Sequence, residues 1–78
     1  MNAVFVGRDG TAWNLSHARR LSIYQPAADS PYQIIAQWVN SSGSDILAKF
    51  ETLEAAKAAV VQIASEWYLT HDDLKGTV

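Results

Sequence analysis

Cysteine is absent from this sequence of 78 residues. Its absence excludes disulfide bonds and every metal site that needs a thiolate ligand. A chain of this length buries only roughly 60 to 65% of the surface that its unfolded state exposes, so its margin of stability is small. Small domains offset a small core with disulfides, metals or self-association. Self-association is the means that this composition leaves open.

Long apolar runs are missing as well. No run approaches the ~20 residues that a membrane-spanning helix needs. Residues 1–7 also lack the basic start and the long apolar stretch of a secretory signal. We therefore expect a cytoplasmic protein without a membrane partner.

Positive charge is not in excess either. Six lysines and arginines stand against eight acidic residues, which gives a formal net charge of -2. This balance argues against unassisted binding to a nucleic-acid backbone. The charge is unevenly distributed, because residues 1–24 are net positive and residues 25–78 are net negative. Such a distribution suits pairwise contact between proteins better than contact with nucleic acid.

Hydrophobic residues make up 49% of the chain and charged residues 18%, which is typical of a chain that folds. The Asp9-Gly10 pair predicts a tight hairpin turn, and Pro26 and Pro31 predict an exposed loop. Between these turn signals, β-prone segments predict strands at about 3–7, 11–15, 19–25, 32–40 and 45–51.

Alternation along the last two predicted strands indicates which side chains face the core. We expect the inward set to be Tyr32, Ile34, Ala36 and Trp38 in the first, and Ile46, Ala48 and Phe50 in the second. Ile35 and Leu47 alternate to the outside.

Thr52 is a predicted N-cap of a helix over about 53–70, with Glu54 in the first turn, where a negative charge favours the helix dipole. At 100° per residue the apolar stripe contains Leu53, Ala56, Val60, Ile63, Ala64 and Trp67. Residues 71–78 are predicted to be a frayed tail. The whole pattern predicts a single α+β domain over residues 1–78, an antiparallel β-meander or small β-roll of four to five strands packed against one long C-terminal α-helix.

The chemistry-bearing side chains form no recognisable site. His71, Asp72 and Asp73 are metal-binding residue types, but consecutive helical residues point about 100° apart and cannot all face one ion. His17 has no carboxylate close by in sequence that would complete a nucleophile-and-base arrangement. We predict no catalytic, cofactor-binding or metal-binding residue, and therefore no enzymatic activity.

The strongest signal for function is the set of apolar residues that remain exposed once the core is filled. The predicted interface consists of Tyr24, Ile35, Val39, Leu47, Val61 and Tyr68. Contiguous exposed apolar patches usually mark interfaces, and a symmetric dimer is the commonest closed assembly. We therefore predict a small protein–protein interaction or accessory domain that forms a homodimer or binds another protein. The alternative is a sheet that curls enough to bury both faces.

A nucleic-acid-binding regulatory module is the competing prediction. It would use Arg8, Arg19 and Arg20, with Tyr24 nearby, because arginines and aromatics on a sheet can stack on bases. The net charge has the wrong sign for this function, and a solvated edge with Arg–carboxylate pairs accounts for the same residues. We do not expect nucleic acid to be the main partner.

The order of these signals resembles a group of small bacterial and prophage-encoded proteins. The telling piece is the sequence LAKFETLEAA at residues 47–56, where a last strand runs through a Phe-x-Thr junction into a closing helix. The resemblance implies a curved β-meander or pleckstrin-homology-like roll capped by a helix. It implies no activity, because the group has no established biochemistry to carry over.

Overall fold

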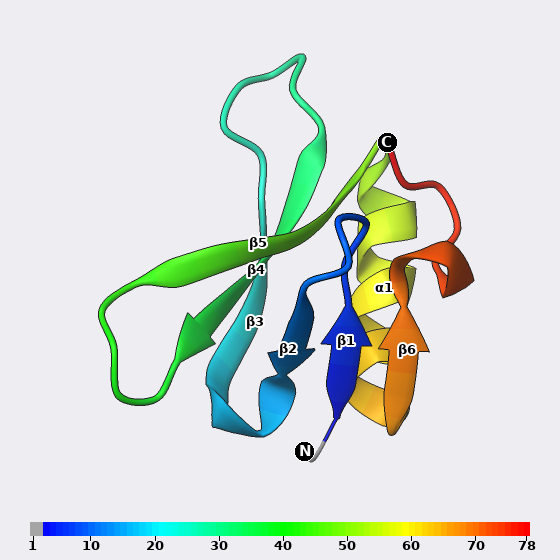
Figure 1. Cartoon of the computed structure of the whole chain (residues 1–78). Coiled ribbons are helices and arrows are strands. Elements are labelled where there is room, and N and C mark those ends of the chain that lie inside the picture. Colours follow the sequence, from blue (N-terminus) through cyan, green and yellow to red (C-terminus); the bar gives the residue numbers. More distant parts are fainter. Residues whose placement is uncertain (1–2) are drawn as a thin grey trace.

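The computed structural model describes residues 3–78 (Figure 1). In chain order the elements are β1 (Val4–Val6), β2 (Ala12–Asn14), η1 (Leu15–His17), β3 (Ala18–Tyr24), β4 (Tyr32–Trp38), β5 (Ser44–Phe50), α1 (Leu53–Ser65), β6 (Tyr68–Thr70) and η2 (His71–Asp73), where η marks a 3₁₀ helix. The predicted α+β class is therefore confirmed.

The strands form two three-stranded sheets instead of one meander of four to five strands. Sheet A has the order β2-β1-β6, with β1 antiparallel to β2 and parallel to β6. Sheet B has the order β3-β4-β5 and is antiparallel throughout. One core cluster contains side chains from both sheets and from α1, and neither sheet closes into a barrel.

Local hydrogen bonds build the turn between β1 and β2 where the sequence predicts it. Gly10 has a φ of 86°, which an L-residue adopts only with strain, and its N–H donates to the Gly7 carbonyl at 3.0 Å. The Thr11 N–H donates to Asp9 Oδ1 at 3.0 Å. This backbone hydrogen bond is the main reason that the pKa of Asp9 is lowered from its ordinary value.

Helix α1 begins where the N-cap predicts but ends early. The Thr52 hydroxyl accepts a hydrogen bond from the Ala55 N–H at 3.1 Å. The last helical residue is Ser65, because Glu66 takes an extended conformation and the chain then pairs with β1. The prediction of a helix to about residue 70 is wrong, since the β-prone residues after Glu66 find a strand partner.

Residues 71–78 are folded rather than frayed. The N–H and the hydroxyl of Thr70 both donate to Asp73 Oδ2, at 2.9 and 3.1 Å, which holds the start of η2, and Leu74 is buried. Thr77 forms an antiparallel bridge with Phe50. Figure 1 shows this segment, orange to red, returning past α1 to the junction between β5 and α1.

The core lies between the two sheets and α1, and its largest fully buried side chains are Phe5, Leu15, Ile34, Phe50 and Ile63. Buried Ile34 and Ala36 agree with the predicted inward face of β4, while Tyr32 and Trp38 are partly buried against the same cluster. Trp38 stacks on Trp13 with a centroid distance of 6.0 Å, and so connects sheet B with sheet A. Its indole Nε1 donates to Asp45 Oδ2 at 2.6 Å.

A β-bulge reverses the predicted facing of two residues in β5. Ile34 pairs with Ala48, but the next residue of β4, Ile35, pairs with Ile46, so Leu47 is the extra residue. As a result Leu47 is buried and Ile46 is 47% exposed. The predictions that Leu47 faces outward and Ile46 inward are wrong, because a bulge shifts the two-residue alternation by one position.

Candidate interaction surface

The structure distributes the predicted interface residues over several surfaces. Tyr24 and Ile35 lie on the face of sheet B that points away from the core, and Val39, just after β4, is 55% exposed. Tyr68 lies on the outer face of sheet A, and Val61 is 68% exposed on α1. Leu47 is buried and cannot contribute to an exposed patch. The six residues therefore do not form a single surface.

The outer face of sheet B is mixed in polarity. Its central row runs from Ser22 through Ile35 to Ile46, because these residues are in register. Ile46 thus occupies the place next to Ile35 that the sequence assigned to Leu47. The surrounding positions are Arg20, Tyr24, Gln33, Gln37, Ser44 and Lys49. This pattern is typical of a solvated face of an antiparallel sheet.

The edges of sheet B are also unsuited to pairing with another chain. In β3 the register shifts between Ala18 and Arg20, which places Arg19 in a bulge. In β5 the bulge is at Leu47, and the residues after it are covered by residues 76–78. Bulges, edge charges and a covering segment are the usual protection of an edge strand.

The most exposed aromatic side chains are consecutive residues at β6. Trp67 is 70% exposed and Tyr68 is 57% exposed. Tyr68 is in register with Val4, and the Val4 N–H donates to the Trp67 carbonyl at 3.0 Å. Because Phe5 and Leu69 point into the core, the alternation directs Val4 and Tyr68 to the outside. We call Val4, Trp67 and Tyr68 the aromatic surface.

An open cavity of about 450 Å³ adjoins this aromatic surface. It is lined by Val4, Ala12, Trp13, Asn14 and Trp67. The sequence predicts a helix to about residue 70, and that prediction places Trp67 on the buried face of the helix. The signal that could have corrected this is the run Trp-Tyr-Leu-Thr at 67–70, which is made of residues that favour strands.

The arginines of the nucleic-acid prediction lie on separate elements. The Arg8 side chain is held in the β1–β2 turn, where Nη2 donates to the Val78 carbonyl at 2.7 Å and lies 3.4 Å from His71 Nε2. Arg19 and Arg20 lie near the start of β3, beyond the other end of β2. Figure 1 shows the turn and the start of β3 at opposite ends of sheet A. The structure does not bring the three together.

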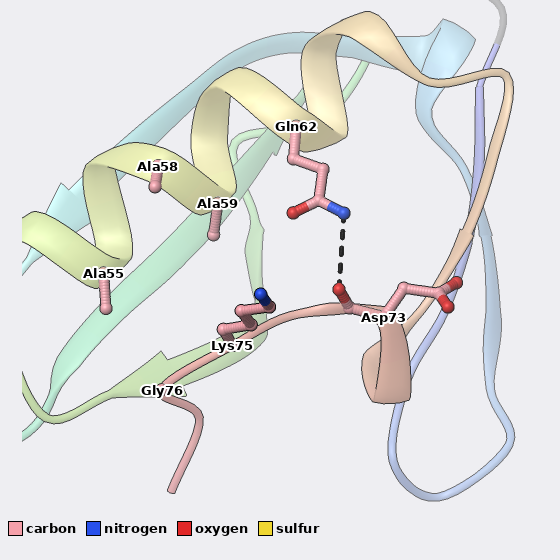
Figure 2. Close-up of a pocket in the computed structure, with 7 residues that line it drawn as sticks. All are labelled: Ala55, Ala58, Ala59, Gln62, Asp73, Lys75 and Gly76. Carbon is pink, nitrogen blue, oxygen red and sulfur yellow. Dashed lines mark hydrogen bonds between the residues drawn. The ribbon is translucent and has the colours of Figure 1, made fainter.

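An open cavity of about 550 Å³ lies between α1 and residues 73–76 (Figure 2). Its helical side is lined by Ala55, Ala58, Ala59 and Gln62, and its other side by Asp73, Lys75 and Gly76. Gln62 Nε2 donates to the Asp73 carbonyl at 3.3 Å across this gap. The Asp73 carboxylate points away from the cavity, because it accepts from the N–H and hydroxyl of Thr70. The lining offers an alanine surface and few polar groups.

The histidines lie apart from any recognisable catalytic group. His71 is buried and its Nδ1 lies 4.0 Å from Asp72 Oδ1, whereas His17 is exposed. Among residues 3–78, no group of three His, Asp or Glu side chains is placed to hold a metal ion. None of the helices formed by the described residues is long and apolar enough to cross a membrane.

Comparison with known proteins adds nothing to this geometry, because no protein-family model, curated protein or solved structure matches the chain. The class is therefore set by the fold and the surface alone: a small α+β protein with an uncovered aromatic surface on sheet A. The function proposed below rests on that surface.

Proposed function

We propose that the protein is a small protein-interaction module that self-associates through the aromatic surface. The exposure of Trp67 and Tyr68 is the observation that supports this function. Tryptophan and tyrosine are the residue types most enriched among interface hot spots. A two-fold arrangement would place the same aromatic surface of two copies against each other.

The magnitude of this contact predicts a concentration-dependent dimer. The exposed parts of Trp67 and Tyr68 amount to roughly 300 Å² per copy, given the ~150–250 Å² that an aromatic side chain buries. At about 25 cal/mol per Å², two copies gain roughly 15 kcal/mol gross if both side chains are fully covered. Association costs an estimated ~4–15 kcal/mol before ordering of side chains is included. The gain and the cost are of the same order, so we expect a concentration-dependent association rather than a permanent dimer.

Sedimentation equilibrium over a range of concentrations tests the proposal. The parent chain should approach twice its mass of 8.6 kDa at high micromolar concentration. Trp67→Asp should abolish the association, because it places a charge in the middle of the contact. Ile35→Asp and Val61→Asp are matched controls on sheet B and on α1, and they should leave it intact.

Two results would contradict the proposed function. One is a parent chain that stays monomeric at high micromolar concentration. The other is a Trp67→Asp chain, with the circular dichroism of the parent, that associates as strongly as the parent. A loss of association in Ile35→Asp alone would move the interface to sheet B.

A further inference from the structure

An open cavity of about 450 Å³ lies between the β1–β2 turn and β5. The turn contributes residues 7–9 to its lining, β5 contributes residues 46–49, and Trp13, His71 and Val78 complete it. Figure 1 shows the turn, in blue, beside β5. Ligand pockets usually have volumes of roughly 300 to 1,000 Å³, so this cavity has room for a small molecule.

Basic side chains come from both sides of this cavity. Arg8 belongs to the turn and Lys49 to β5. Among residues 3–78, neither forms an ion pair with a side-chain carboxylate. The acidic residue of the lining is Asp9, which is exposed and whose Oδ1 accepts the Thr11 N–H within the turn. Because water screens an exposed charge, the two basic groups dominate the lining and favour an anion.

Neighbouring groups hold the Arg8 guanidinium in place before any ligand arrives. Its Nη2 donates to the Val78 carbonyl at 2.7 Å and lies 3.4 Å from His71 Nε2. Arginine has no acceptor, so the imidazole nitrogen accepts and His71 is neutral in this arrangement. The N–H groups of Nε and Nη1 have no hydrogen-bond partner among residues 3–78. A side chain that is already positioned loses less conformational freedom on binding, which favours affinity.

The remaining lining is apolar. Residues 46–48 and the Trp13 indole supply it. Trp13 stacks on Trp38 with a centroid distance of 6.0 Å, and this contact fixes the indole. Small-molecule sites usually combine an apolar lining with a few polar groups that orient the ligand. A ligand that uses both parts of this cavity needs a negative group and a flat apolar group.

We propose that this cavity binds a small organic carboxylate that carries a flat apolar group. The carboxylate contacts Arg8 and Lys49, and the apolar group lies against Trp13. Hydrogen bonds between ionised groups are stronger than those between neutral groups, and the planar guanidinium matches the geometry of a carboxylate. The inference does not rest on self-association, because Trp67 and Tyr68 do not line this cavity.

Titration of the ¹⁵N-labelled chain with benzoate, followed by NMR, tests the inference. Benzoate should cause a saturable shift of the Trp13 indole N–H and of the amides of residues 7–9, and should leave the Trp67 indole unmoved. Benzamide has the same shape without the charge, so it should bind at least about 10-fold more weakly. Inorganic phosphate has the charge without the ring and should also bind more weakly than benzoate.

Three variants assign the binding to the basic side chains. Arg8→Gln should weaken benzoate binding by at least about 10-fold, because it removes a charged donor. Lys49→Gln should weaken it by about 2- to 5-fold, since Lys49 is exposed and its charge is screened. Arg20→Gln is the matched control, because Arg20 is an exposed arginine that does not line the cavity, and it should bind as the parent does.

Three results would overturn the inference. One is the absence of a saturable shift with benzoate up to about 50 mM, which exceeds the range expected for a ligand of this size. Another is binding of benzamide or phosphate as strong as that of benzoate. The third is binding by Lys49→Gln and a folded Arg8→Gln that equals binding by the parent. If Arg8→Gln does not fold, Lys49→Gln and the benzamide comparison decide. A chain that binds benzoate but remains monomeric ends the proposed function and leaves this inference standing.

Discussion

Replacing Gly76 with alanine probes how residues 74–78, which we call the strap, are held against β5 and α1. Gly76 has a φ of 78°, and an added Cβ would lie 2.9 Å from the Cβ of Ala55. The left-handed backbone costs a non-glycine residue about 1 to 2 kcal/mol. The steric conflict adds about 1 to 3 kcal/mol if the strap stays in place.

Release of residues 76–78 alone, which leaves Leu74 in the core, sets an upper limit to this loss. Undocking sacrifices two backbone hydrogen bonds, which contribute about 1 kcal/mol each, and the Arg8 contact. We therefore expect Gly76→Ala to lower the free energy of unfolding by about 2 to 3 kcal/mol. Urea denaturation measures this loss. Hydrogen exchange should also be faster at the Val78 and Glu51 amides, because the Val78 N–H leaves its acceptor, the Lys49 carbonyl, and the Glu51 N–H loses the Gly76 carbonyl.

Two other glycines separate the contributions. Gly10 has a φ of 86° but no atom within 4 Å of an added Cβ, so Gly10→Ala measures backbone strain alone, about 1 to 2 kcal/mol. Gly43 has no positive φ, and the atom nearest to an added Cβ is the Ser41 hydroxyl oxygen at 3.3 Å, which accepts an exposed hydrogen bond from the Gly43 N–H, so Gly43→Ala should cost less than about 1 kcal/mol. If Gly76→Ala costs no more than Gly43→Ala, the close approach of the strap to α1 is refuted.

Further predictions concern the bulge and acid sensitivity. Leu47→Asp buries an unpaired charge, so it should prevent folding or lower the free energy of unfolding by more than about 3 kcal/mol. Ile46→Asp lies at an exposed position and should change this free energy by less than about 1 kcal/mol. Equal losses for the two variants in urea denaturation would refute the bulge. The lowered pKa of Asp9 means that its contribution to stability is complete above its ordinary value of 3.8 and is lost as pH falls through the lower folded value. Asp9→Asn should therefore flatten the acid side of the stability profile in thermal unfolding, and an unchanged profile would show that the Thr11 hydrogen bond does not matter.

Elements set by neighbouring residues could be predicted from the sequence. The turn at Asp9-Gly10 depends on a positive φ and a short side-chain bond, and the start of α1 depends on the Thr52 cap. The inward direction of Ile34 and Ala36 follows from alternation within one strand. Each of these features is decided by contacts between residues a few positions apart, so a local pattern is enough to find it.

Features set by distant partners could not be read from the pattern. Trp67 left the predicted helix because residues 68–70 pair with β1, at the other end of the chain. Leu47 faces inward because the register of β4 and β5 shifts by one residue. Residues 74–78 are folded because β5 and Arg8 provide hydrogen-bond partners for them. Helix propensity and alternation contribute little folding free energy per residue, whereas pairing with a strand supplies hydrogen-bond partners to several backbone N–H and C=O groups at once. The composition therefore determined an α+β chain with surplus apolar side chains, and the long-range strand pairing decided which of them, Trp67 and Tyr68 above all, reach the surface.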